Sequence, residues 1–284
     1  MLKISSVFFE GLGIPPFEVD SVALRIGSFT IAWYAVIICI GMILSVLYIM
    51  WRAKQNDIKT DHILDMALVV IPLGIIGARL YYVLTSLERF HSFWEILNLR
   101  TGGLAIYGGI IGGAIGVIIM ARVKKISFFC LADMICPGVL IGQILGRWGN
   151  FFNAEAYGGE TTLPWRMGLY RGGEWIFVHP TFLYESLWNL LGFLLINWYY
   201  GFKKEKTHKK YDGEIFLMVF GWYGFGRMLI EGLRTDSLYV GPFRISQVLG
   251  FVFFIAAAGL WIYHRISKTD MLFRPLDGSK KEKE

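Results

Sequence analysis

Four polar side chains recur at helical spacing inside an apolar stretch in the last third of the chain. Tyr223, Arg227, Glu231 and Arg234 are separated by four, four and three positions, which places them on one face of a helix. An ionised group at membrane depth usually faces a polar interior and lies on a functional path. We therefore expect this face to border a water-filled cavity. The alternative is a buried Arg227–Glu231 pair that only joins two helices.

A second polar group lies at the end of another apolar stretch, within residues 142–159. It contains Arg147, Asn150, Asn153 and Glu155 among several small residues. Small residues let helices approach closely, while these four side chains bring hydrogen-bonding groups to one helix end. The pattern predicts a binding site, although a glycine-rich helix end without a function would have a similar composition.

The other candidates have ordinary structural explanations. Arg79 lies near the outer end of a stretch loosened by Pro and Gly, where a site role and contact with lipid phosphate explain it equally well. The glycine-rich run 102–113 favours close packing of helices over a lipid-binding surface. His179 fits a surface position better than a catalytic base. Trp33 and Tyr34 fit an aromatic belt at the membrane interface.

The elements that carry these residues are predicted to be membrane-spanning helices. Hydrophobic residues make up 55% of the chain and charged residues 18%, which is too apolar for a soluble domain of 284 residues. Three stretches hold no charge and are long enough to cross a bilayer, and four more carry one to a few charges. We predict an all-α polytopic membrane protein of about seven transmembrane helices with a small external head. The stretches are 31–50, 62–84, 101–121, 127–152, 181–202, 213–233 and 245–263.

The distribution of basic residues predicts the orientation. Lys and Arg concentrate in cytoplasmic loops. With the N-terminus outside and the C-terminus inside, 17 of them fall in inside segments and 8 in outside segments. The net charge of +6 therefore reflects topology, and we expect no nucleic-acid partner.

The chain is predicted to form a single membrane domain over residues 1–284 with two external insertions. The insertion at about 85–100 mixes aromatic, aliphatic and charged residues, which suits an amphipathic element at the interface. The insertion at about 153–180 is rich in Gly, Trp and Tyr and could form a small cap. We find no internal repeat.

Taken together, these motifs resemble those of the prolipoprotein diacylglyceryl transferases, bacterial enzymes that begin lipoprotein maturation. The resemblance runs from residue 34 to about residue 234 and is most specific in GRWGNFFNAE at 146–155; it also includes GGLAIYGG, HPTFLYES and RMLIEGLR. It implies a multi-pass protein of the bacterial plasma membrane, with seven helices and the orientation given above. The implied substrates are phosphatidylglycerol and prolipoprotein signal peptides with a lipobox cysteine, and neither a cofactor nor a metal is expected.

The implied reaction transfers the diacylglyceryl group to the cysteine thiol, which forms a thioether and releases glycerol phosphate. Many family members have His at the position of Tyr107, where it has been assigned as the general base. That departure leaves the role of Tyr107 open, although we keep it among the candidate catalytic residues. The residues that carry over by motif are Tyr34, Arg147, Asn150, Glu155, Gly158, Arg227 and Glu231.

The resulting hypothesis is that Arg147 and Arg227 bind the lipid phosphate, because a guanidinium fork matches phosphate oxygens. Their positive charge would stabilise the departing phosphate. Asn150, Glu155 and Gly158 would contact the lipid headgroup, and Glu231 would hold Arg227. The base stays open among Tyr107, Glu155 and His179.

Two other classes of protein remain as alternatives. A transporter of an anionic solute could use the same arginines, but it would usually show repeated halves or broken helices. A structural scaffold would leave Arg147, Asn150 and Asn153 unexplained.

Overall fold

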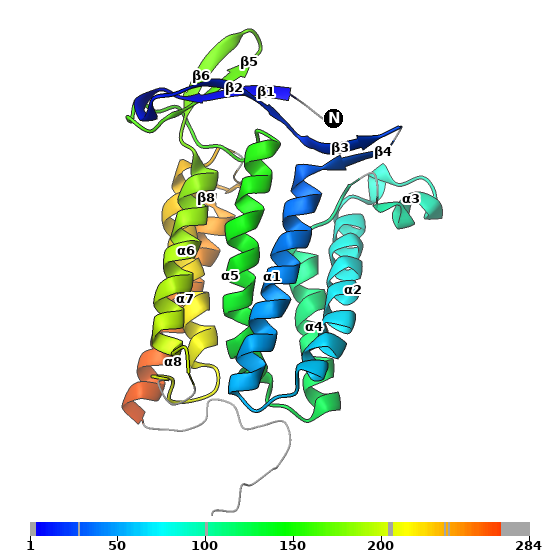
Figure 1. Cartoon of the computed structure of the whole chain (residues 1–284), viewed down its shortest axis with the longest axis vertical. Helices are drawn as coiled ribbons and strands as arrows, with labels where there is room; N and C mark the ends of the chain where they lie inside the picture. The colour runs from blue at the N-terminus through cyan, green and yellow to red at the C-terminus, as the bar shows by residue number, and fades with distance from the viewer. Residues whose placement is uncertain are drawn as a thin grey trace, which may run out of the picture.

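Long helices run side by side beneath a small β-structure in the computed structural model of the chain (Figure 1). The structure describes residues 4–27, 29–99, 102–203, 207–235, 237 and 239–267. A helix occupies each of the seven predicted stretches, with its ends displaced by a few residues at most. In chain order these helices are α1 (Trp33–Gln55), α2 (Thr60–Thr85), α4 (Ile106–Lys124), α5 (Phe128–Phe152), α6 (Thr181–Tyr200), α7 (Glu214–Ile230) and α8 (Ile245–Ser267).

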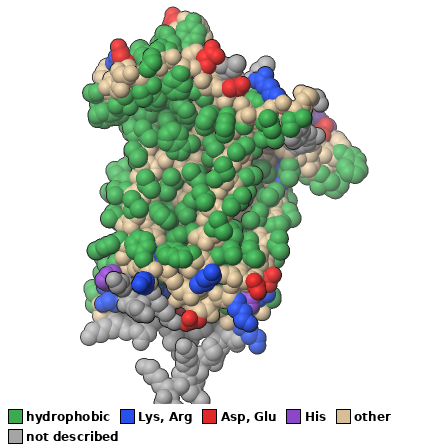
Figure 2. Space-filling model, viewed as in Figure 1, with side chains coloured by type: hydrophobic (Ala, Val, Ile, Leu, Met, Phe, Trp, Pro, Cys, Tyr) green, Lys and Arg blue, Asp and Glu red, His purple; other side chains and the backbone are tan. Residues whose placement is uncertain are grey.

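Five of these helices, α1, α2, α4, α5 and α8, are long and apolar enough to cross a membrane. Helix α6 carries the polar residues Glu185, Asn189 and Asn197, and α7 has 17 residues. Hydrophobic side chains cover the flank of the helices, and charged side chains gather near the two ends (Figure 2). This surface is consistent with a polytopic membrane protein, because apolar groups face lipid at no cost.

The all-α prediction is wrong for the head, which is built from β-strands. Strands β1 (Ile4–Phe9), β2 (Ile14–Asp20), β5 (Met167–Arg171) and β6 (Glu174–Val178) form an antiparallel sheet in the order β2-β1-β5-β6. Strands β3 (Val22–Ile26) and β4 (Phe29–Ala32) form a hairpin, and β7 (Tyr239–Val240) pairs with β8 (Phe243–Arg244). A search for helix-length apolar runs passes over strands of four to seven residues, because their period is two. The predicted cap at 153–180 therefore contains β5 and β6, two of the four strands of this sheet.

The buried face of the sheet packs on the ends of α5 and α6. Val7, Leu169 and Val178 from three strands contact Phe182 at the start of α6 in one hydrophobic cluster. Phe151 near the end of α5 packs against the same cluster. The sheet is thus seated on two helices that carry polar residues described below, and it fixes the position of the ends that it covers.

The insertion after α2 contains the short helices η2 (Leu87–Arg89) and α3 (Phe93–Leu97), with Phe93 and Trp94 largely exposed. The exposed aromatics agree with the predicted amphipathic element. The Arg79 side chain is buried beneath this insertion. Its guanidinium donates hydrogen bonds to the carbonyl oxygens of Glu95, Ile96, Asn98, Gly102 and Gly103. Arg79 therefore holds the insertion against α2, and its guanidinium is occupied by the backbone where contact with lipid phosphate had been one expectation.

Glycines let α4 approach α2 at backbone distance, as the sequence predicted for the run 102–113. A Cβ atom on Gly108 would lie 2.2 Å from the carbonyl oxygen of Gly77, and one on Gly112 would lie 2.2 Å from that of Leu73. No side chain fits at either distance. The close-packing interpretation is confirmed at these positions.

Gly112→Ala is expected to destabilise the protein by about 1 to 3 kcal/mol, because the added methyl group forces the two helices apart. Gly113→Ala is the matched control, since its Cβ would meet only Val70 Cγ1 at 3.9 Å. Thermal unfolding of both variants in the same detergent measures the difference. Equal stability of the two variants would contradict the close contact.

Helices α6 and α7 are joined by a reciprocal pair of tryptophans. The Trp188 and Trp222 rings are stacked with centroids 4.3 Å apart. Each indole N–H donates to the other residue's carbonyl oxygen, at 3.2 Å from Trp188 and 3.0 Å from Trp222. Gly192 and Gly226 provide the space, because a Cβ on either would lie within 2.2 Å of the facing indole nitrogen. This pair fixes the spacing of the two helices next to the site.

Candidate functional site

Three arginines from different parts of the chain converge on one carboxylate. Glu185, on the second turn of α6, is buried. Its Oε2 pairs with Arg147 Nη2 from α5 and, at 3.2 Å, with Arg227 Nη1 from α7. Its Oε1 accepts from Arg234 Nη1 at 2.9 Å. We call these four residues, together with Glu231, the arginine cluster.

Arg227 has a second carboxylate partner in Glu231, whose Oε2 lies 2.8 Å from Arg227 Nη2. The predicted pair therefore exists. The single helical face is wrong beyond Ile230, because α7 ends there and Glu231 begins a 3₁₀ turn. Arg234 follows this turn with an extended backbone, which lets its side chain reach back to Glu185.

The arginine cluster carries a net positive charge. Counted by formal charge, its three guanidinium groups and two carboxylates sum to +1. The Arg147 side chain is 24% exposed, whereas the Glu185 side chain is 8% exposed. An approaching anion would therefore meet the arginine before the carboxylate that holds it. The cluster suits a substrate with one negative charge.

A cavity of about 70 Å³ opens onto the cluster. Arg147, Glu185 and Arg227 contribute to its wall. Of the predicted polar face, Tyr223 and Arg227 border this cavity, whereas Glu231 and Arg234 are not among its lining residues. Gln143, one turn before Arg147, has a buried Oε1 with no hydrogen-bond partner among the described residues. A substrate N–H or O–H group could satisfy it. The remaining lining residues are Ile106, Trp188, Asn189, Tyr223, Gly226 and Ile230.

A series of hydrogen bonds leads from the cluster to the end of α5 that lies next to the head. Asn150 Oδ1 accepts from Arg147 Nη1 at 3.4 Å, and Asn150 Nδ2 donates to Glu155 Oε1 at 3.1 Å. Asn153 Nδ2 donates to the same oxygen, also at 3.1 Å. The structure thus brings Asn150 and Glu155 together with Arg147, as their spacing predicted. Glu155 is exposed and forms the last member of this series of hydrogen bonds.

Gly158 has a structural position beside the cluster. Its N–H donates to the carbonyl oxygen of His179 at 2.9 Å, and it forms a β-bridge with Arg234. A Cβ there would lie 2.6 Å from His179 Cβ and 2.8 Å from the Leu233 carbonyl oxygen. Gly158 therefore positions the backbone that carries Arg234. His179 itself faces Tyr184, with Nδ1 3.3 Å from the hydroxyl oxygen.

Tyr107 and Tyr34 lie apart from the arginine cluster's ion pairs. Tyr107 is 42% exposed and packs beside Tyr81 with ring centroids 6.2 Å apart. Tyr34, at the start of α1, packs on Gly149, where a Cβ would lie 2.5 Å from Tyr34 Cδ2. Tyr34 is therefore next to the helix segment that carries Arg147, whereas Tyr107 follows Ile106, which lines the cavity.

Glu185 and Gln143 are missing from the residues predicted by sequence, whereas Arg234 was expected on the polar face but given no role in the site. Glu185 stands inside the HPTFLYES motif, and an ionisable residue in an apolar stretch is a candidate by the same rule that selected Arg227. That rule would have found it. Gln143 carries no charge, and its significance comes only from an unpaired atom that a sequence cannot show. Among the residues that the structure describes, no group of three or more His, Cys, Asp or Glu is placed to hold a metal ion.

Relatives that share one name cover most of the chain. A family model described as prolipoprotein diacylglyceryl transferase matches residues 21–263. A phosphatidylglycerol–prolipoprotein diacylglyceryl transferase of Listeria welshimeri is 42% identical over 265 residues, covering 90% of this chain and 93% of the relative. Similar enzymes are found in Clostridium perfringens, 42% identical over 81% of this chain and 88% of the relative, and in Finegoldia magna, 41% identical over 88% and 99%.

Proposed function

Because the chain belongs to the prolipoprotein diacylglyceryl transferase family, we propose that the arginine cluster is where it transfers the diacylglyceryl group of phosphatidylglycerol to a prolipoprotein cysteine. One observation carries this assignment: three arginines converge on Glu185 in a cluster of formal charge +1, and two of them, Arg147 and Arg227, line a cavity. Phosphatidylglycerol carries one negative charge on its phosphodiester. The charges of the cluster and of this lipid therefore match.

The proposed reaction is a substitution at the glycerol carbon that bears the phosphate ester. The lipobox thiol loses its proton to a base, the sulfur forms a bond to that carbon, and the carbon–oxygen bond to phosphate breaks. Glycerol phosphate leaves with the bonding electrons. Arg147 and Arg227 stabilise its additional negative charge, because they are already held at the position where it develops.

The hydrogen-bond chain from Arg147 supplies the remaining roles. Asn150 and Glu155 orient the headgroup, and Gln143 Oε1 can accept a hydrogen bond from a glycerol hydroxyl. Glu231 holds Arg227 by their 2.8 Å ion pair. Gly158 contributes through its backbone, because it positions the segment that carries Arg234.

Glu155 is the candidate base that the geometry favours. It is joined to Arg147 through Asn150, whereas His179 is paired with Tyr184. A tyrosine phenol is a poor proton acceptor at neutral pH, which disfavours Tyr107 as the base. We keep Tyr107 and Tyr34 as residues of the cavity's surroundings, where they can contact the acyl or peptide part of a substrate.

Transfer of labelled lipid from phosphatidylglycerol to a lipobox peptide tests the proposed function directly. We expect labelled peptide with the purified full chain, and we expect none when the peptide cysteine is replaced by serine. A chain that moves the lipid or an anionic solute across vesicles without labelling the peptide would be a transporter. No contact among the residues that the structure describes favours a transporter.

Arg227→Lys is expected to lower the transfer rate by about 10- to 100-fold. Lysine keeps the charge but loses the fork that contacts Glu185 and Glu231 simultaneously, and a charged hydrogen bond contributes about 1.5 to 3 kcal/mol. The matched control is Arg25→Lys, because Arg25 is an exposed arginine of the head, paired with Asp20. Full activity of Arg227→Lys at normal protein level would remove Arg227 from the site.

The membrane placement is part of the proposal. All seven long helices cross the bacterial plasma membrane as one domain, with the head and N-terminus outside and the C-terminus inside. A reporter fused after Lys204 is expected to behave as cytoplasmic, and one inserted near Gly172, in the turn between β5 and β6, as external. The reverse pattern would overturn the orientation.

A further inference from the structure

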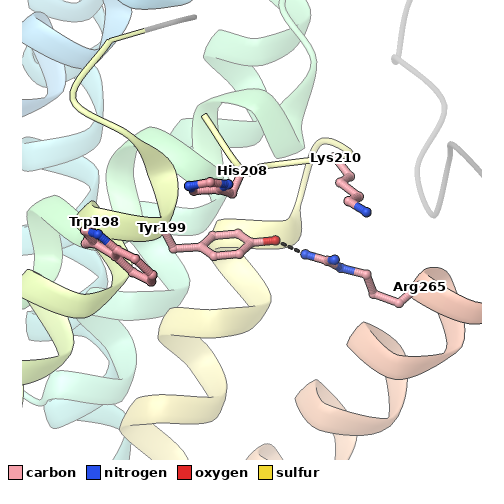
Figure 3. A pocket seen from close by; sticks show the side chains of 5 residues that line it. All are labelled: Trp198, Tyr199, His208, Lys210 and Arg265. Carbon is pink, nitrogen blue, oxygen red and sulfur yellow. Dashed lines mark hydrogen bonds between the residues drawn. The ribbon is translucent and has the colours of Figure 1, made fainter. Parts of the chain in front are cut away.

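A second pocket lies at the end of the bundle opposite the head. It has a volume of about 440 Å³ and is lined by residues from the end of α6, the connection to α7 and the end of α8. Three of its lining side chains are basic, two are aromatic, and none is acidic (Figure 3). They are Trp198, Tyr199, His208, Lys210 and Arg265.

A buried carboxylate under the pocket fixes this lining. Glu214 is fully buried, and its Oε1 accepts from Arg265 Nε at 3.0 Å, Arg265 Nη2 at 2.8 Å and the Tyr199 hydroxyl at 2.9 Å. Its Oε2 accepts from the backbone N–H of Lys210 at 2.6 Å. Arg265 is thus held along one edge, which leaves Nη1 without a hydrogen bond to any residue in the described ranges. Figure 3 shows its guanidinium next to the Tyr199 hydroxyl.

The charges at this pocket do not cancel. The Lys210 ammonium makes no ion pair with a carboxylate in the part of the chain that the structure describes. Lys209 differs, because it pairs with Asp133 at 2.9 Å and Asp212 at 2.7 Å. Burial acts to lower the pKa of Lys209, but these carboxylates outweigh it and raise the pKa. The two positive charges of Lys210 and Arg265 and the one negative charge of Glu214 therefore leave a formal charge of +1 at the pocket.

The surroundings of the pocket indicate a lipid as the source of the matching anion. Trp198 is 66% exposed, and tryptophan is enriched at the level of lipid headgroups. One turn toward the middle of the bundle, α6 exposes Leu194 and Leu195 and α8 exposes Ile262. These side chains share faces with the pocket residues of the same helices. A headgroup in the pocket would thus have its acyl chains along an apolar surface.

We propose that this pocket binds the phosphodiester headgroup of an anionic phospholipid from the leaflet opposite the arginine cluster. Basic pockets between helix ends are a common form of anionic-lipid site. The volume lies within the range of small-molecule sites. The proposal is independent of the transfer reaction, because the arginine cluster lies at the other end of α6 and α7.

Native mass spectrometry of the full chain in detergent, titrated with phosphatidylserine, tests the proposal. Lys210→Gln is expected to weaken retention of one lipid by about fivefold, and the double variant with His208→Gln to weaken it at least as much. The matched control is Lys203→Gln, a lysine of the same connection that does not line the pocket. Phosphatidylcholine is the neutral lipid control, and inorganic phosphate is the free-anion control.

The outcomes separate the possibilities. Weaker retention in Lys210→Gln alone, with no displacement by inorganic phosphate, supports the lipid site. Equal retention in wild type and Lys210→Gln overturns it, as does equal weakening by Lys203→Gln. Displacement by inorganic phosphate at the lipid's own concentration would show a free-anion site and also overturns it. Transfer to the lipobox peptide in detergent should be unchanged in Lys210→Gln, so failure here is distinct from failure of the proposed function.

Discussion

Arg147→Ala is expected to lower turnover by about 100- to 1,000-fold, more than Tyr107→Phe does. Of the three arginines in the cluster, Arg147 has the most exposed side chain, and it contacts both Glu185 and Asn150. Its removal leaves the departing phosphate without the group that would first meet it. A loss of this size is typical when one charge-stabilising donor is deleted from a preorganised site.

Tyr107→Phe is expected to have a smaller effect for two reasons. Tyr107 is exposed and takes no part in the ion pairs around Glu185. A free thiol has a pKa near 8.5, so forming the thiolate at pH 7 costs only about 2 kcal/mol, which limits what a base can contribute. Tyr107→His should be near wild type.

Rates of labelled-lipid transfer in detergent or liposomes, at matched expression, decide the order of the three variants. The ranking would be wrong if Tyr107→Phe were inactive while Arg147→Ala kept its activity. In that case Tyr107 would be the base, and proton transfer would dominate the barrier. A circular-dichroism spectrum of each variant checks that it is folded.

Glu185→Gln is expected to have the largest effect on stability, with an unfolding free energy lower by about 3 to 5 kcal/mol. The substitution keeps the shape of the side chain but removes the negative charge shared by Arg147, Arg227 and Arg234. The cluster charge then rises from +1 to +2 inside the bundle. Turnover should fall by about 100-fold, because the arginines move from their positions.

Added phosphatidylglycerol gives this prediction a sharper test. The lipid phosphate can replace the missing negative charge, so it should raise the melting temperature of Glu185→Gln more than that of wild type. Glu160→Gln is the matched control, because Glu160 is an exposed carboxylate of the head. Wild-type stability of Glu185→Gln, or an equal response of both proteins to the lipid, would contradict the shared-charge arrangement.

The helices could be predicted from sequence because hydrophobicity over about 20 residues is a local property. The Arg227–Glu231 pair and the group of Arg147, Asn150 and Glu155 could also be predicted, because the members of each are close in the sequence. Glu185 is different, because its importance comes from three partners on separate segments. Sequence spacing shows which residues share a helix face, but it does not show which faces meet.

The errors have a common physical origin in non-local backbone contacts. Arg79 was expected at a lipid phosphate or in a site, yet it binds five carbonyl oxygens 16 to 24 positions later in the chain. The β-head escaped prediction because its strands are short and its pairing joins distant segments. In both cases the backbone is the partner, and a hydrophobicity pattern carries no information about it.

The pairing of β1 with β5 has a consequence for the order in which the protein folds. Val7 is paired with Leu169, so the edge of β1 that faces away from β2 must wait for a partner made about 160 residues later, about 10 to 30 s at ordinary rates of synthesis. Helices α1 to α5 are complete before that partner exists. Contacts of such long sequence separation form slowly, because the loop between them must close first. The four-stranded sheet is therefore completed only after α1 to α5 have been made, and until then the hairpin of β1 and β2 presents an unpaired strand edge.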